Sequence, residues 1–379
     1  MKRLTILIAA ILLCMFVIVP IARQILSTDQ NSVPDTGTAI LEGGAILVRG
    51  PQNTLSTISQ QINEPTIFSY DAKRKLALCR GNIIVEGELT IGQPDAEGLT
   101  ETLEFNTKIC GDCMLLVRPG GLLQVHNAEI STKNRMIVHG LCPMGYGIIG
   151  QGRLVMKNVR LLYMSGSVSK MFSGREASGL LDTVVSQGGE TNTFSYDGID
   201  GSKVTITNSS FIGGSGTSGA WAGFTFNEPV IISNSTMIAK GSDIVIEEGA
   251  NLILIDCKFR PNKLNFTGRK AKVDIRRKKT FRVVDAQGHP VSGATVTAQS
   301  MKDAAHPFSV TAETDENGLA ALTLREYIAE RNSHIRKDGV NNSAPYTVTA
   351  THAGLACSVD NVDIRTVSDD TTITELALE

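Results

Sequence analysis

The side chains best suited by type to acid–base chemistry lie in the stretch SYDGIDGSKVTITNSSF, which contains Asp197 and Asp200. Glycoside hydrolysis with inversion needs one carboxyl group as acid and a second as base, on opposite sides of the scissile bond. The segment after the next predicted strand, from Ile212 to Gly223, contains no carboxylate. Asp197 alone cannot supply both groups. Asp197 is the catalytic candidate of this stretch, but we expect both aspartates to be turn residues.

Cysteines and one histidine form the second candidate group. Cys110 and Cys113 are separated by two residues, and Cys142 follows His139 closely in HGLCPMG. Three cysteines and a histidine could hold zinc, but only one pair has typical ligand spacing. In an exported chain, disulfides or buried thiols are the commoner use, and redox chemistry is a further alternative. We expect no cofactor.

Two features could bind a ligand without chemistry. Trp221, the single tryptophan, lies in the Gly/Ser-rich segment GGSGTSGAWAGF and could stack on a sugar, although packing is the more common role. The segment from Gly268 to Lys279 is strongly basic and could clasp an anionic polysaccharide. It could equally be a solvated junction that discourages pairing at a sheet edge, and we favour this interpretation. Its candidate ligand-binding residues are Arg276, Arg277, Lys278 and Lys279.

The overall charge argues against one class of partner. The 379 residues include 36 basic and 38 acidic side chains, for a formal net charge of -2. Nucleic-acid-binding proteins usually carry a basic excess, so we expect no nucleic acid partner. With 36 glycines and only 5% aromatic residues, the composition favours many turns and an all-β architecture.

The N-terminus has the pattern of an export segment. Lys2 and Arg3 precede an apolar run from Leu4 to Ala22, about as long as a bilayer-spanning helix requires. No A-x-A cleavage site follows, so we expect residues 1–23 to remain as a membrane anchor, with a cleaved signal peptide as the alternative. Either outcome places the rest of the chain outside the cytoplasm, membrane-anchored or secreted.

A polar residue recurs at the end of successive apolar-alternating strands. The recurring residues are Asn127, Asn158, Asp182, Asn208, Asn234 and Asp256, spaced 31, 24, 26, 26 and 22 residues apart. A repeat of this length points to a solenoid, and the absence of intervening helices favours stacked β-coils. Asn and Asp tolerate the left-handed backbone of a sharp bend, so we expect these side chains to form a ladder along one corner.

This repeat resembles the right-handed parallel β-helix (pectin-lyase-like) superfamily over residues 41–275, after a linker at 24–40. The resemblance implies a single-stranded right-handed solenoid. SYDGID is also similar to the N-T-D-G-[IF]-D stretch of polygalacturonase-type hydrolases, in which Asp197 would be the matching carboxylate. Ser195 and Tyr196 depart from that pattern.

Residues 276–379 have a different sequence pattern. The turns VVDAQGHPVSGATV and TDENGLAAL join alternating strands and predict a small antiparallel β-sandwich. They resemble the carboxypeptidase regulatory-like (transthyretin-like) family, which implies an accessory module without catalytic residues. Within this region, LREYIAERN from Leu324 to Asn332 is the best candidate for an amphipathic helix.

These observations leave two classes of function. The first is a noncatalytic exported or membrane-anchored surface protein that binds glycan or acts as a structural, adhesin-like element. The alternative is a carbohydrate-active enzyme, a hydrolase, lyase or epimerase built on the β-helix. The fold alone does not decide between these classes, because one fold can carry many functions. The missing acid–base pair favours the first class.

Overall fold

The computed structural model describes residues 37–106, 113–132, 146–164, 169–188, 193–213, 218–301, 304, 306–331, 343–364 and 374–378. Most of these residues lie in strands, so the expected all-β class is confirmed. In the described ranges, no helix has the length and apolar character to cross a bilayer. The proposed anchor at residues 1–23 lies outside those ranges.

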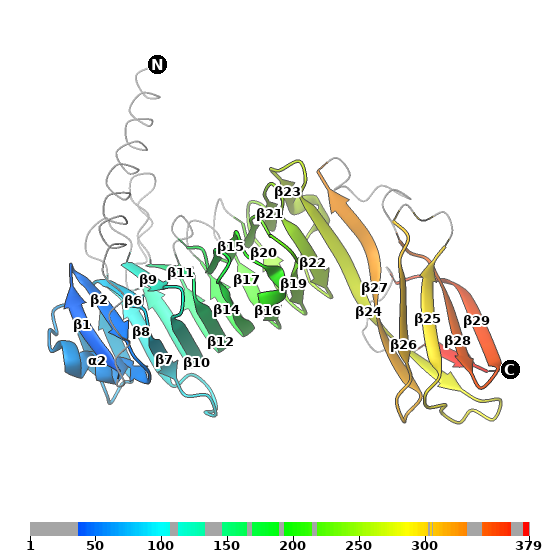
Figure 1. Cartoon of the computed structure of the whole chain (residues 1–379), viewed down its shortest axis with the longest axis horizontal. Helices are drawn as coiled ribbons and strands as arrows, with labels where there is room; N and C mark the ends of the chain where they lie inside the picture. Colours follow the sequence, from blue (N-terminus) through cyan, green and yellow to red (C-terminus); the bar gives the residue numbers. More distant parts are fainter. Residues whose placement is uncertain are drawn as a thin grey trace, which may run out of the picture. The chain divides into compact units, whose positions relative to one another are not determined.

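Most strands pair in parallel with the equivalent strand one repeat later, which produces the stacked coils in Figure 1. This arrangement is consistent with a β-solenoid, and we call it the stack. One sheet contains β1 (Thr38–Glu42), β2 (Ala45–Arg49), β6 (Asn82–Val85), β9 (Cys113–Val117) and β11 (Tyr146–Gly150). A second contains β13 (Phe172–Ser173), β15 (Ser195–Asp197), β18 (Ala220–Ala222), β21 (Ile244–Ile246) and β23 (Leu264–Phe266).

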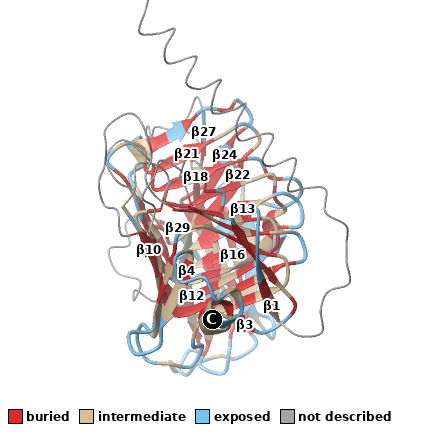
Figure 2. Cartoon of the chain, turned by 90° about the vertical axis from the view of Figure 1, so that its left-hand side faces the viewer, coloured by how far each residue is buried: buried red, intermediate tan, exposed pale blue. Residues whose placement is uncertain are grey.

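The largest sheet runs along the whole stack and bends within each coil. It continues through β24 (Lys272–Val284) into the C-terminal region, and its other strands in the stack are β3 (Asn53–Thr54), β4 (Phe68–Asp71), β5 (Leu76–Cys79), β7 (Glu88–Gly92), β8 (Glu101–Phe105), β10 (Leu122–Thr132), β12 (Arg153–Leu162), β14 (Ser178–Gln187), β16 (Val204–Thr207), β17 (Ser210–Ile212), β19 (Val230–Ser233), β20 (Thr236–Ile238) and β22 (Asn251–Ile255). Apolar residues alternate inward, as Val204 and Ile206 do in β16, and they form one continuous core. Figure 2 shows these buried positions in red along the strands.

The polar corner is present, with one change of register. The backbone has a positive φ at Asn127, Asn158, Thr183, Asn208, Asn234 and Asp256. The prediction is therefore confirmed for five of the six ladder residues, but wrong for Asp182. Asp182 pairs with Lys157, one residue before the corner, and Thr183 occupies the bend.

Side-chain amides join neighbouring coils along this corner. Asn158 donates to Asn127 at 2.7 Å, and Asn234 donates to Asn208 at 3.4 Å. Asn208 donates to Asp182 at 2.9 Å, so the Asp182 carboxylate still takes part from its neighbouring position. The Asn158–Asn127 bond is partly buried, whereas the other two are exposed to solvent.

Helix positions differ from the expectation. The described α-helix is α2 (Leu55–Ile62), which starts at a capping box formed by Thr54 and Thr57. The segment expected as an amphipathic helix, from Leu324, belongs instead to strand β27 (Leu319–Glu330). That prediction was wrong because β27 pairs along almost the whole length of β24 (Lys272–Val284).

β24 continues from the last coil into the C-terminal sheets. It pairs with β22 in the stack and with β27 and β30 (Thr374–Ala377) beyond it. A four-stranded antiparallel sheet follows: β25 (Thr295–Ser300), β26 (Ser309–Glu313), β28 (Tyr346–His352) and β29 (Leu355–Val362). Tyr327 and Ala329 of β27 belong to the core of the stack, whereas Leu322 and Leu324 belong to the C-terminal core.

Candidate functional site

Asp197 ends strand β15 at the turn that leads towards the largest sheet. On the preceding coil it pairs with Ser173, and on the next coil Gly223 follows the residue that pairs with Tyr196. The Asp197 carboxylate lies 2.6 Å from Nζ of Lys170 and also accepts the backbone N–H of Phe224 at 3.3 Å. Its immediate partners are therefore a cation and a backbone amide.

Glycine on the next coil makes this contact possible. A Cβ at Gly223 would lie 2.8 Å from Oδ1 of Asp197 and 2.5 Å from the carbonyl oxygen of Tyr196. Any larger residue at position 223, including an aspartate, would displace the Asp197 side chain. The position next to Asp197 on the following coil thus excludes a second carboxylate by packing as well as by sequence.

Asp200 caps the short 3-10 helix Gly201–Lys203 and accepts from the backbone and hydroxyl of Ser202. It also accepts from the Asn227 amide at 3.0 Å on the next coil. These hydrogen bonds lower the pKa of Asp200, and the bond from Asn227 has the largest effect. The expectation of a turn residue is confirmed here, and an ionised carboxylate saturated by donors is poorly suited to act as an acid.

Trp221 occupies the middle of β18 and pairs with Ser195 on one side and Val245 on the other. Its flanking residues Ala220 and Ala222 are buried, and Trp221 itself is half-buried. It is thus a sheet residue between two nearly buried neighbours rather than a ring standing free on a loop.

Two aromatic residues that the sequence analysis did not single out lie three and five positions after Trp221. Phe224 and Phe226 are 41% and 38% exposed, and no other phenylalanine in the described ranges is exposed. Their ring centroids lie 4.9 Å apart at an interplanar angle of 87°, and the Arg175 guanidinium lies 4.2 Å from the centre of Phe226. In the sequence, the alternation Phe-Thr-Phe was the available signal, and the structure shows that Thr225 between the two rings is buried.

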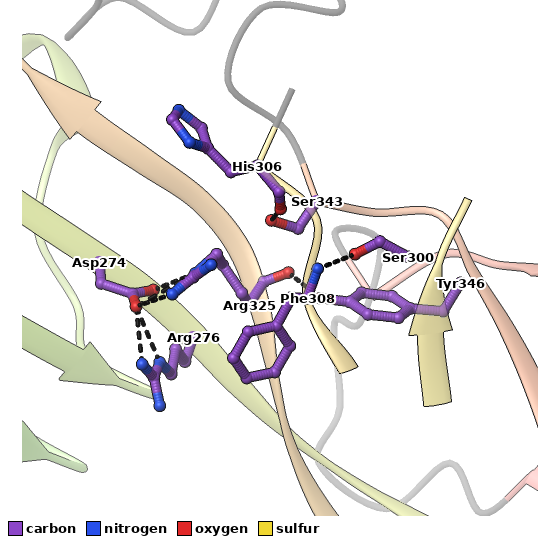
Figure 3. A network of polar contacts seen from close by, with 8 residues as sticks. All are labelled: Asp274, Arg276, Ser300, His306, Phe308, Arg325, Ser343 and Tyr346. Carbon is purple, nitrogen blue, oxygen red and sulfur yellow. Dashed lines mark hydrogen bonds and ion pairs between the residues drawn. The ribbon is translucent and has the colours of Figure 1, made fainter. Parts of the chain in front are cut away.

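The basic run makes intramolecular contacts (Figure 3). Asp274, nearly buried, accepts from the guanidinium groups of Arg276 and Arg325. Phe308 packs against both guanidinium groups, at 5.2 and 4.6 Å from its ring centre. Burial alone would raise the pKa of Asp274, but the hydrogen bonds from Arg325 and Arg276 outweigh it and leave the pKa lowered.

The remaining cations of the basic run differ in how far they are exposed to solvent. Arg277 forms an ion pair with Glu326 at 3.1 Å. Lys279 is buried and Lys278 is exposed. Three of the four predicted ligand-binding cations are thus engaged or buried at the junction between β24 and β27.

The cysteine prediction lies largely outside the described residues. Cys110, His139 and Cys142 fall in undescribed segments, whereas Cys113 is buried in β9. Within the described ranges no group of three or more potential metal ligands occurs. Burial raises the pKa values of the Cys79 and Cys257 thiols to about 12, so neither is a ready nucleophile.

Comparisons with protein-family models, with curated proteins and with solved structures found no match to this chain. Its function therefore has to be argued from the geometry of its own side chains. The turn that carries Asp197, Phe224 and Phe226 is where charged and aromatic groups gather on adjacent coils, and we treat it as the candidate functional site.

Proposed function

We propose that this protein is a noncatalytic surface protein whose right-handed β-helix is held outside the cytoplasm and binds glycan. The observation that carries the proposal is the environment of Asp197. Its neighbours on the preceding and following coils are Ser173 and Gly223, and its carboxylate is paired with Lys170. Neither of these register neighbours can act as the acid or base that glycosidic cleavage would need beside Asp197.

The polygalacturonase-like pattern would require a carboxylate pair after the next strand. At that place this chain has Gly223 and Phe224, and the backbone of Phe224 donates to Asp197. An aromatic ring and a glycine can contribute to binding but cannot transfer a proton. This replacement supports a binding role for the same surface of the stack.

The C-terminal sheets fit the proposal as a covering module in the carboxypeptidase regulatory-like pattern. Their first strand continues the last coil, and Tyr327 of β27 fills the core of the stack. A module built in this way would close the open end of the solenoid, which otherwise exposes unpaired backbone groups. The apolar N-terminal run would act as the membrane anchor.

The test is turnover by the full-length protein. We would measure the release of reducing sugars and unsaturated products from neutral and anionic polysaccharides, for the wild type and for Asp197→Ala. We expect no product from either protein. Turnover that disappears in Asp197→Ala would reject the noncatalytic proposal and assign the chain to the carbohydrate-active enzymes. Thr205→Ala, at an exposed position of β16, is the matched control.

A further inference from the structure

We propose that Phe224 and Phe226 form a stacking platform for a neutral glycan chain. This inference rests on the proposed function and locates its binding site and ligand class. We call the two residues, with Arg175 beside them, the aromatic edge. Two large apolar rings kept about 40% exposed on a turn need an explanation, because the other described phenylalanines are buried or half-buried.

The backbone of the aromatic edge is fixed by adjacent coils. The carbonyl of Phe224 accepts from Gly198 at 2.9 Å, and Phe226 donates to the carbonyl of Ile199 at 2.9 Å. Thr225 between them is buried and donates to Gly249. Hydrogen bonds to adjacent coils therefore fix the backbone that carries both rings, so little backbone entropy is lost when a ligand binds.

The side chains are held as well. A Cβ at Gly249 would lie 2.5 Å from Cδ2 of Phe224, so glycine at this position lets the ring lie against the backbone of the next coil. Gly249 also has a φ of +72°, which favours glycine a second time. The Arg175 guanidinium packs on the Phe226 ring, and Lys203 donates to the carbonyl of Arg175 at 3.0 Å. The near-perpendicular rings thus present a preformed corner with one apolar wall on each side.

The chemistry of this corner suits a sugar. Pyranose rings carry C–H groups on their faces and hydroxyl groups at their edges, so they pair an aromatic surface with surrounding hydrogen-bonding groups. Asp200, Asn227 and Ser202 lie on the same turns, where Ser202 and Asn227 donate hydrogen bonds to the Asp200 carboxylate.

Charge narrows the class of sugar. The turns that meet at the aromatic edge carry fewer basic than acidic side chains: Lys170, Arg175 and Lys203 against Glu176, Asp197, Asp200, Glu228, Glu247 and Glu248. Lys170 is already paired with Asp197. No excess of positive charge would attract a polyuronate or a sulfated chain, so a neutral or N-acetylated glycan fits best.

The experiment measures binding of neutral oligosaccharides of glucose, mannose, xylose and N-acetylglucosamine to the full-length protein by calorimetry. Polygalacturonate serves as the anionic probe. We expect at least one neutral probe to bind, and Phe224→Ala/Phe226→Ala to weaken it by about tenfold or more, because two stacking contacts are lost. Ile231→Ala, 44% exposed on strand β19, is the matched control and should bind as the wild type does.

A second variant guards against a folding defect. Because Trp221 is the only tryptophan, Trp221→Phe/Phe226→Trp places a single indole at the aromatic edge. Its fluorescence should shift on addition of the glycan that binds the wild type, while circular dichroism stays unchanged. Loss of binding in Trp221→Phe alone would instead place the ligand on β18 and overturn the inference.

Other outcomes separate this inference from the proposed function. Binding that survives Phe224→Ala/Phe226→Ala, binding of polygalacturonate alone, or no binding by any neutral probe overturns the aromatic edge as the site. None of these binding results is evidence of turnover, so the proposal that the protein is noncatalytic would stand. Conversely, turnover lost in Asp197→Ala rejects the noncatalytic proposal whether or not the aromatic rings bind sugar.

Discussion

The polar corner and the aromatic edge of the stack use their side chains in opposite ways. At the polar corner, side chains such as Asn127, Asn208 and Asp256 form hydrogen bonds to side chains or backbone of neighbouring coils. At the aromatic edge, Phe224 and Phe226 face solvent, and the ion pair of Asp197 with Lys170 is partly exposed. Hydrogen bonds at the first turn serve the fold, whereas the second turn leaves apolar surface available to a ligand.

The comparison can be broken most sharply at Asn127, which is 7% exposed. Its amide donates to the carbonyls of Gln93 and Pro94, and its oxygen accepts from Asn158. Asn127→Leu should lower the free energy of unfolding by about 1–3 kcal/mol, because the substitution removes all three of these partly buried hydrogen bonds. Denaturant unfolding measures the change.

Asn234→Leu is the matched substitution at an exposed position of the same corner. Its bond to Asn208 is long, at 3.4 Å, so we expect a smaller loss than at Asn127. Equal losses at the two positions would show that backbone conformation, rather than side-chain bonding, determines the residue type at the corner.

Thr183 is the irregular member of the corner. It has a φ of +56°, which is unfavourable for a β-branched residue. Thr183→Asn should raise the free energy of unfolding by about 1 kcal/mol, because strain is relieved and an amide comes within reach of Asn158 and Asn208. Thr183→Gly relieves the strain alone. If glycine stabilises as much as asparagine, the ladder bond contributes nothing at this coil.

The error at Asp182 shows what limits prediction of this corner from sequence. GLLDTVVS contains a single acidic residue, so residue type points to Asp182, but strand pairing with Lys157 places it one position early. The other corner residues were predictable because Asn or Asp recurs after each alternating strand. Register is a property of two paired strands, so the sequence of one strand alone cannot reveal it.

The candidate site was harder to predict, for a related reason. Trp221 and the phenylalanines flank Gly223 within six residues, and composition favours tryptophan as a sugar platform. Their exposure depends on which residues adjacent coils place beside them: Val245 beside Trp221, but Gly249 against Phe224. Similarly, Leu324 to Asn332 has helical spacing, yet β24 supplies a partner strand that outweighs that local preference.

His126 allows the corner to be probed by pH. It is nearly buried beside Asn127, and no described group bonds to its Nε2. Burial, followed by the charge of Lys157, lowers its pKa below 6.5, while Asp95 acts in the opposite direction. The unfolded chain then binds the proton more readily, so stability is full above pH 6.5 and falls as the pH drops below it.

Replacement of the histidine isolates this contribution. His126→Gln should flatten the part of the stability–pH curve just below pH 6.5, measured by thermal unfolding across buffers of constant ionic strength. His352→Gln, at a half-buried position of strand β28, is the control and should leave that slope unchanged. An unaltered slope in His126→Gln would mean that other groups cause any acid sensitivity of the corner.

The smallest effect is expected at the aromatic edge, from the ion pair of Lys170 with Asp197. Their side chains are 52% and 37% exposed, so water and salt screen the attraction, and exposed pairs typically contribute about 0–1 kcal/mol. Lys170→Ala leaves the bond from the Phe224 backbone to Asp197 in place. It should therefore change the free energy of unfolding by less than about 1 kcal/mol, and less still in high salt. A loss as large as that of Asn127→Leu would contradict the division between the two turns. It would mean that the edge is held by its charges, and that the exposed rings of Phe224 and Phe226 depend on this pair for their position. Unfolding curves of both variants, recorded at low and high salt, decide between these outcomes.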